Sequence, residues 1–313
     1  MSENSLVKYE ELTYLSADGD TAVHAYIWVP AQKPLGIIQL SHGMCEYILR
    51  YEAWARRFAA AGYVVCGNDH LGHGYTAPDE AALGHIAPRN GEDVLVEDLH
   101  TLSVLIKKRY PDLPLVLYGH SMGSFAARLY LSKYGTELAA ALISGTAGPG
   151  LPAGAGRTLA HTIAKVKGKQ HRSQLLTSMA FGSYNKRFEG EQDTFSWLTR
   201  QKAVRDAYRQ DKFCTFVFTA EGYDTLFALI GKVSKKEWFA SVPRKLPVLL
   251  FAGDMDPVGN YGKGVRAVYE RLQKQGCHVT LRLYEGGRHE MHNELNADEV
   301  FADLLAYLKE NVK

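Results

Sequence analysis

One short segment in the middle of the chain constrains the fold more than any other. An apolar run at residues 115–118 leads directly into Gly-His-Ser-Met-Gly at 119–123, and a helix-like stretch follows at 124–134. A serine between two glycines at a strand-to-helix turn is typical of a nucleophile elbow, whose strained turn exposes the serine at a sheet edge. Side chains at either glycine would collide with the neighbouring strand and helix. The pattern also arises by chance on loops, so the flanking strand and helix carry the prediction that Ser121 is a nucleophile.

Two later strands end in loops that carry the partners a nucleophilic serine needs. Residues 248–252 read as a buried strand and lead into Gly-Asp-Met-Asp-Pro at 253–257. Residues 279–284 read as a further strand and lead into Glu-Gly-Gly-Arg-His at 285–289. The loops after both strands are expected at the same sheet edge as the elbow.

These loops predict a catalytic triad of Ser121, Asp256 and His289, in which the histidine accepts the serine proton and the carboxylate orients the histidine. The chain order is that of α/β hydrolases. Asp254 competes with Asp256 for the acid. Pro257 favours Asp256, because a residue before proline is held extended.

The chain has 12 histidines, so His289 has to be weighed against the others as the base. His120 adjoins Ser121 and is covalently too close to bend back onto it. Three further histidines lie in glycine-rich turns, where hydrogen bonds to the loop backbone are expected: His70, His73 and His85. His289 is the histidine on the exit loop of the last predicted strand.

A second loop supplies candidate groups for an oxyanion hole. Residues 37–40 read as a strand, and Ser-His-Gly-Met follows at 41–44. Backbone N–H groups stabilise an oxyanion when they are aimed at the developing charge. We predict Met44 and Met122 as the two donors, Met122 because it follows the nucleophile at the start of a helix. An ordinary strand-to-helix turn is the alternative for the His-Gly loop.

Four blocks of this sequence resemble the monoacylglycerol lipase and lysophospholipase-like branch of the α/β hydrolases, often described as serine aminopeptidase-like. The blocks are HGMCEYILRYEAWARRFAAAGYVVCGNDHLGHG, GHSMG, GDMDP and YEGGRHEMHNE, and they span the chain from about residue 36 to the C-terminus. The resemblance implies the same triad and the same two oxyanion donors.

The resemblance further implies that Glu46, Arg50 and His292 lie near the polar head of the substrate. The sequence departs from the usual pattern at Cys45, where glycine is common, and at Tyr47, where histidine is common. An alternative for Glu46 and Arg50 is a simple ion pair on one side of a helix, since they are four residues apart. His292, three residues after the predicted base, could equally be a structural loop histidine.

The rest of the chain predicts an α/β-hydrolase fold, with a mostly parallel central sheet, flanking helices and an inserted helical cap. A hairpin is expected around Asp18-Gly19, further strands at 36–40 and 63–68, and helices near 51–61 and 94–110. The chain of 313 residues exceeds the roughly 200–250 residues of one such domain. We assign the excess to a cap.

The predicted division is a core at 1–146 and 243–313 and a mainly helical cap at 147–242. The cap segment lacks β alternation and is bounded by glycines and prolines on both sides. It is rich in large apolar residues, and an apolar lid above a nucleophilic serine suits an acyl chain. A basic run at 157–172 is either a solvated helix face or a site of transient contact with an anionic membrane surface.

Composition excludes several classes of function. A formal net charge of +2 and the lack of a basic-aromatic strip argue against nucleic acid as a partner. The N-terminus has no signal-peptide pattern and no run of about 18 apolar residues occurs, so a cytoplasmic protein is expected. Cysteines 45, 66, 214 and 277 are scattered and are expected to be reduced. No metal spacing, P-loop or dinucleotide fingerprint is found, so no metal or cofactor is expected.

The expected function is cofactor-independent hydrolysis of carboxylic esters with an apolar acyl group through an acyl-enzyme, as in monoacylglycerol lipases, lysophospholipases or carboxylesterases. An iminopeptidase-like aminopeptidase or arylamidase could use the same triad. It would need a cap carboxylate for the free amine, for which the candidates are Glu189, Glu191, Asp193 and Glu221. A non-catalytic ligand-binding protein on the hydrolase scaffold is the third alternative.

Overall fold

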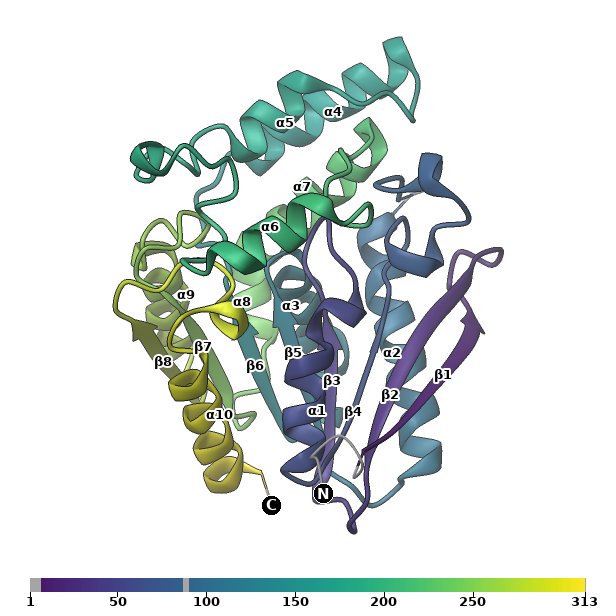
Figure 1. Cartoon of the computed structure of the whole chain (residues 1–313), viewed down its shortest axis with the longest axis vertical. Helices are drawn as coiled ribbons and strands as arrows, with labels where there is room; N and C mark the ends of the chain where they lie inside the picture. The colour runs from purple at the N-terminus through teal and green to yellow at the C-terminus, as the bar shows by residue number, and fades with distance from the viewer. Residues whose placement is uncertain (1–6, 87–89, 313) are drawn as a thin grey trace.

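The computed structural model describes residues 7–86 and 90–312. Within these residues one eight-stranded sheet forms the centre of the molecule, with the strand order β1-β2-β4-β3-β5-β6-β7-β8 (Figure 1). The strands are β1 (Val7–Leu15), β2 (Ala22–Pro30), β3 (Gly36–Ser41), β4 (Tyr63–Asn68), β5 (Leu115–His120), β6 (Ala140–Ser144), β7 (Val248–Gly253) and β8 (Val279–Tyr284). β1 and β2 form an antiparallel hairpin, and β2 pairs antiparallel with β4. All strands from β4 to β8 in the sheet order pair in parallel, so their carboxyl ends meet at one edge.

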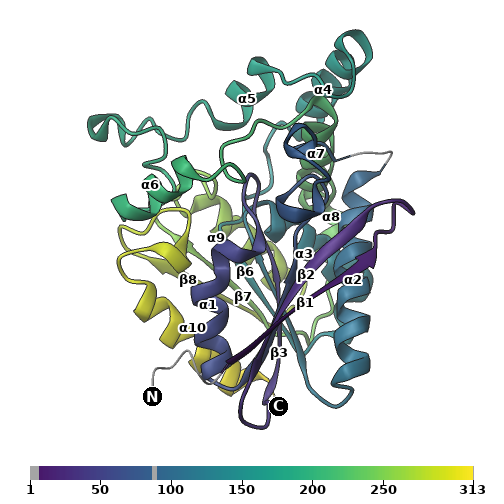
Figure 2. The same ribbon diagram turned by 45° about the vertical axis from the view of Figure 1, so that its right-hand side comes forward.

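Helices cover both faces of the sheet. The core helices are α1 (Glu52–Ala60), α2 (Gly91–Arg109), α3 (Met122–Tyr134), α9 (Lys263–Lys274) and α10 (Ala297–Asn311). α1 and α10 lie on one face, and α2, α3 and α9 lie on the other (Figure 2). Successive strand residues point to opposite faces, so Ile37 packs in one hydrophobic core and Ile38 in the other. Burial on both faces explains why the central strands read as continuous apolar runs.

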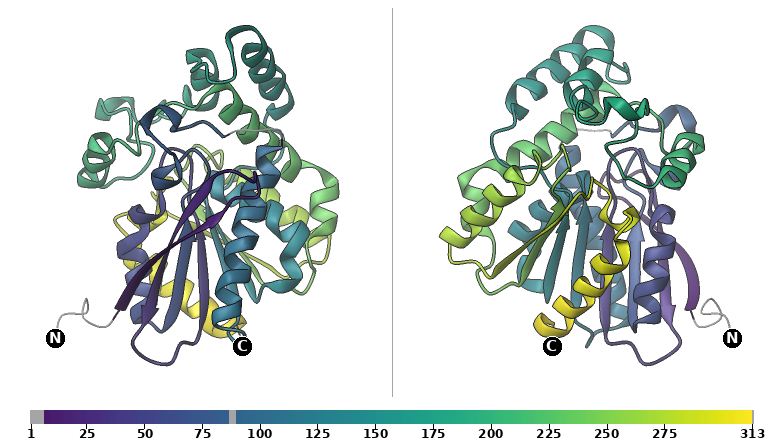
Figure 3. Two further views of the ribbon diagram at one scale, coloured as in Figure 1. Left: turned by 90° about the vertical axis from the view of Figure 1, so that its right-hand side faces the viewer. Right: turned by 60° about the vertical axis from the view of Figure 1, so that its left-hand side comes forward.

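Five α-helices lie between β6 and β7 in the chain. They are α4 (Ala153–Lys167), α5 (Gln174–Phe181), α6 (Lys202–Gln210), α7 (Ala220–Ser234) and α8 (Lys236–Ser241). Of these, α4, α5 and α6 lie beyond the carboxyl ends of the parallel strands (Figures 1 and 3). α4 and α5 lie outermost, whereas α7 packs against α2 and α3, and α8 packs against α3 and α9. The predicted cap limits at 147 and 242 bracket all five helices, and we keep that division as a proposal.

The predicted fold class is confirmed, and the differences from the predicted elements concern their ends. For example, α2 begins at Gly91 instead of residue 94. All four cysteines are free and buried. No helix within residues 7–86 and 90–312 is long and apolar enough to cross a membrane.

Candidate active site

Ser121 occupies the sharp turn between β5 and α3. Its backbone has φ 52° and ψ −121°, a conformation that residues with a side chain rarely adopt. A Cβ atom on Gly123 would lie 2.1 Å from the carbonyl oxygen of Ser41, and one on Gly119 would lie 2.5 Å from the carbonyl oxygen of Gly123. The predicted steric need for both glycines is thereby confirmed, and the strained turn presents Ser121 at the sheet edge.

Ser121, His289 and Asp256 form one chain of hydrogen bonds. The His289 Nε2 atom lies 2.8 Å from Ser121 Oγ, and His289 Nδ1 lies 3.0 Å from each carboxylate oxygen of Asp256. Asp256 follows β7 and His289 follows β8, so both reach the serine from the same edge. A proton on Nδ1, held by the carboxylate, leaves Nε2 free to accept the serine proton.

Asp254 has a different partner. Its Oδ1 atom accepts a hydrogen bond of 2.8 Å from the Gly286 N–H, on the loop that leads to His289. The structure therefore joins Asp256, and not Asp254, to the histidine. Asp254 supports the backbone of the loop instead.

The electrostatic surroundings of His289 favour its charged form. Burial by itself acts to lower the pKa of the imidazole, but the adjacent Asp256 carboxylate outweighs burial, and the pKa is raised. Glu290 and Glu46 act in the same direction from further away. An imidazolium formed at this position is therefore stabilised.

The two predicted oxyanion donors lie on either side of Ser121. Met122 is the first residue of α3, and the N–H groups of a first helical turn have no acceptor within the helix. The loop before Met44 packs closely on the serine, because a Cβ atom on Gly43 would lie 3.0 Å from Ser121 Cβ. The Gly43 N–H is bound to Glu46 Oε1 at 2.5 Å, which fixes this loop beside the serine. The function of Met44 and Met122 as donors stays a prediction.

Arg50 connects the loop of Met44 to the loop of His289. Its Nη1 donates to Glu46 Oε2 at 2.6 Å, and both Nη atoms donate to Glu290 at 2.9 Å. All three side chains are buried. Burial acts to raise the pKa of Glu290, but the charge of Arg50 outweighs burial, and the pKa of Glu290 is lowered. For Glu46 burial outweighs the same arginine, and the pKa of Glu46 is raised. Two carboxylates on one guanidinium thus form a buried cluster beside the base.

His292 lies behind this cluster. Its ring stacks on Tyr51 at a centroid distance of 4.4 Å, and neither ring nitrogen has a hydrogen-bond partner among the described residues. Burial lowers its pKa to about 3, so the ring is neutral. Of the three residues predicted near the polar head of the substrate, Glu46 lines a cavity, whereas Arg50 and His292 line neither cavity described below. Glu290 lines the same cavity as Glu46 and was not predicted; its signal is a carboxylate directly after the predicted base.

Two cavities meet at Ser121. One has a volume of about 240 Å³ and the other of about 170 Å³, and both are lined by Met44, Ser121, Phe181 and Trp197. The lining of the larger cavity includes the polar residues Glu46, Asn185, Thr194 and Glu290. The lining of the smaller cavity has no carboxylate and includes Phe125, Leu151, Met179, Leu226, Phe227 and Ile230. The helical segment thus covers the serine and forms most of both walls.

The four carboxylates considered for binding a free amine line neither of these cavities. Glu191 pairs with Arg288, Asp193 with Arg205 and Arg209, and Glu221 with Lys169, while Glu189 is exposed. In the part of the chain that the structure describes, no group of three or more His, Cys, Asp and Glu side chains is arranged to hold a metal ion.

Comparison with known proteins gives a consistent result. Residues 32–296 match the family described as serine aminopeptidase, S33. The chain is 28% identical over 286 residues to the monoacylglycerol lipase of Mycolicibacterium smegmatis, covering 90% of this chain and 91% of that protein. It is 29% identical over 300 residues to the human monoglyceride lipase, covering 92% of this chain and 86% of that protein.

Among solved structures, a thermostable carboxyl esterase from Bacillus coagulans, determined in complex with glycerol, matches with a TM-score of 0.92 and 32% identity. The match covers 97% of this chain and 99% of the esterase. The two lipases and the esterase are all named as enzymes that hydrolyse esters.

Proposed function

Because the chain belongs to the serine aminopeptidase, S33 family of α/β hydrolases, we propose that it is a serine ester hydrolase in which Ser121, His289 and Asp256 are the catalytic triad. The observation that carries this proposal is the hydrogen-bonded chain from Ser121 Oγ through His289 to Asp256, with distances of 2.8 Å and 3.0 Å. It begins at a strained serine that borders two cavities.

The proposed reaction proceeds in two halves. Ser121 Oγ attacks the ester carbonyl carbon while His289 Nε2 accepts the serine proton, and Asp256 stabilises the resulting imidazolium. The Met44 and Met122 N–H groups hold the tetrahedral oxyanion. The bond to the leaving oxygen breaks as His289 returns the proton to the alcohol. Water then attacks the acyl-enzyme by the same route and releases the acid.

The two cavities differ in that carboxylates line only one of them, and this difference supports an apolar acyl group and a polar alcohol. We assign the acyl chain to the cavity lined by Phe125, Phe227 and Ile230, and the alcohol to the cavity whose lining includes Glu46 and Glu290. Two relatives are named as lipases of monoglycerides, and the related esterase was determined with glycerol. A monoglyceride is therefore the substrate we propose, with lysophospholipids and simple carboxylic esters as close variants.

A panel of p-nitrophenyl esters from acetate to palmitate tests the acyl assignment. Activity should rise with chain length, since each buried methylene contributes about 0.8 kcal/mol until the apolar cavity is filled. A strong preference for acetate would contradict it. Aminoacyl arylamides in the same panel test the aminopeptidase alternative, which is disfavoured because none of the four candidate cap carboxylates lines either cavity.

The alcohol assignment is tested with Arg50→Ala and His292→Ala on a monoglyceride and on a p-nitrophenyl ester of the same acyl chain. If the cluster of Glu46, Arg50 and Glu290 contacts the alcohol, the loss is selective for the monoglyceride. Equal losses on both esters would mean that these residues act only by holding the loops in place.

We further propose that the outer helices of the cap contact a lipid surface. Exposed apolar side chains on these helices are Val166, Leu175 and Met179, Leu151 is exposed just before α4, and lysines at 165, 167 and 169 lie nearby in the chain. Co-sedimentation with vesicles of anionic and of neutral phospholipid tests this. Binding to neither kind of vesicle would contradict it.

A further inference from the structure

The cap segment at 191–201 is bound to the loop that carries the proposed base. The His289 N–H donates to the Trp197 carbonyl at 3.3 Å, and the Glu290 N–H donates to the Leu198 carbonyl at 2.8 Å. The next cap residue is Thr199, whose Oγ1 donates to the Asn293 carbonyl at 2.7 Å. The two segments, far apart in the chain, therefore run together along their backbones at the position of His289.

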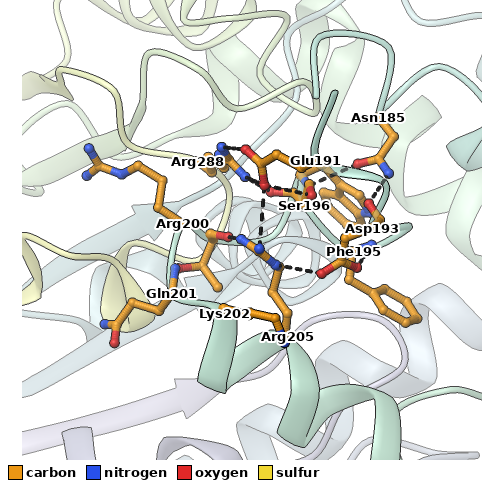
Figure 4. Close-up of polar contacts among 12 residues, drawn as sticks. Asn185, Glu191, Asp193, Phe195, Ser196, Arg200, Gln201, Lys202, Arg205 and Arg288 are labelled. Carbon is orange, nitrogen blue, oxygen red and sulfur yellow. Dashed lines mark hydrogen bonds and ion pairs between the residues drawn. The ribbon is translucent and has the colours of Figure 1, made fainter. Parts of the chain in front are cut away.

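Arg288, directly before the base, is held from the cap side (Figure 4). Its side chain is 10% exposed, and its Nη1 donates to the Ser196 carbonyl at 2.6 Å. Its guanidinium also binds both carboxylate oxygens of Glu191. Glu191 in turn accepts a hydrogen bond from Ser196 Oγ at 2.8 Å and lies 3.4 Å from Arg205 Nη2. Both Nη atoms of Arg288 thus donate to groups of the cap segment.

Glu294 connects the same two segments from the other end of the base loop. Its side chain is 0% exposed. One carboxylate oxygen accepts from the Arg288 N–H and from the Arg200 N–H, each at 3.0 Å. The other accepts from Arg200 Nε at 2.8 Å. A buried carboxylate with three such donors fixes the distance between the loop and the cap segment.

Trp197 brings the cap segment into contact with the base itself. Its ring lies 5.0 Å from the His289 ring and lines both cavities. On the opposite side, Glu290 is held by Arg50 from the core. The loop of His289 therefore lies between a core partner and a cap partner, each attached through a charged pair.

We propose that the cap segment at 191–201 positions the catalytic base, with Glu191 and Arg288 as positioning residues that act through the backbone of His289. The inference rests on the proposed function of His289. It means that the cap is needed for catalysis at Ser121 as well as for binding the acyl chain. A displacement of a catalytic group by about 1 Å can cost on the order of 100-fold in rate.

The test is Glu191→Gln, which keeps the shape of the side chain and removes its charge. We expect kcat to fall about tenfold on both p-nitrophenyl butyrate and p-nitrophenyl laurate, with KM changed less than about twofold. Labelling by a small fluorophosphonate, which does not need the acyl cavity, should slow by the same factor. The matched control is Asp206→Asn, because Asp206 pairs with Lys202 and Arg209 at the cap surface.

A double-mutant cycle separates positioning from general stability. If Glu191 acts through Arg288, adding Glu191→Gln to Arg288→Gln should cause no further loss. Thermal melts of each variant check folding. If Arg288→Gln does not fold, the Glu191→Gln variant still tests the proposal, because Glu191 is half-exposed and its replacement should be tolerated. The proposal is overturned if Glu191→Gln leaves kcat and the labelling rate unchanged, or if it changes KM in a way that depends on chain length. Failure of the proposed function is a different result, in which the unmodified protein is neither labelled nor active on any ester.

Discussion

Arg128 provides a quantitative test of how the cap is joined to the core. This α3 residue is 1% exposed, and its guanidinium donates to Thr146 Oγ1 at 3.1 Å, to the Ala147 carbonyl at 3.0 Å and to the Val233 carbonyl at 2.7 Å. Its Cζ lies 4.4 Å from the ring centroid of Trp238. The acceptors lie at the junction of the core with the start of the proposed cap and near the end of α7, so one side chain joins α3 to two distant parts of the insertion.

We predict that Arg128→Met lowers the free energy of unfolding by about 2–4 kcal/mol. Two buried carbonyl oxygens lose a charged donor, at about 1–3 kcal/mol each. Removing the buried charge also relieves a desolvation cost, which makes the loss of stability smaller. That cost is indicated by the pKa of the guanidinium, which burial lowers. We therefore expect the lower part of the summed range. For a chain of this size, the corresponding fall in Tm is roughly 3–6 °C.

The assay is chemical denaturation, with Arg266→Met as the control. Arg266 lies exposed on α9, and replacement of such a residue changes stability by less than about 0.5 kcal/mol. Arg128→Lys should be intermediate, because an ammonium keeps the charge but cannot reach all three acceptors. The reasoning is refuted if Arg128→Met is as stable as the control variant or more stable.

Three further predictions concern the proposed chemistry. Asp256→Asn should lower kcat on the order of 10⁴-fold, because His289 loses the carboxylate that orients it, whereas Asp254→Asn should cost far less; the reverse order would contradict the assignment. The acid limb of the pH profile of kcat/KM should have its midpoint above the ordinary histidine pKa of about 6.5. The reason is that His289 must be neutral to accept a proton, and Asp256 raises its pKa. A midpoint below about 6.5 would contradict this prediction. Maleimide should react slowly with Cys45, because burial raises the pKa of its thiol, and the adduct should block the cavity; full activity with Cys45 modified would show otherwise.

The fold and the proposed triad could be predicted because their signals are local. Ser121 lies in a turn whose glycines are required by contacts with adjacent strand and helix backbone, and Asp256 and His289 each follow an apolar strand directly. The strand order then brings these three loops to one edge. Apolar runs that mark buried strands, together with the glycines of the turn, are therefore enough to predict where the reacting groups lie.

The supporting interactions could not be predicted, because they depend on tertiary packing. Arg288 and Glu191 are 97 residues apart, and Arg50 and Glu290 are 240 apart. Neither separation leaves a pattern in the sequence. Arg50 and His292 line neither cavity, because the guanidinium is bound by two carboxylates and the imidazole stacks on Tyr51, and their contact with a head group stays a prediction.

The most direct measurement of the central claim is labelling of the protein with a fluorophosphonate, with Ser121→Ala as the comparison. We predict that the parent protein is labelled on Ser121, as located by peptide mass spectrometry, and hydrolyses p-nitrophenyl esters. Ser121→Ala should melt at a similar temperature, take up no label and lose about 10⁴–10⁶ in turnover. A well-folded Ser121→Ala protein that is still labelled or still hydrolyses esters normally would contradict the assignment of Ser121 as the nucleophile.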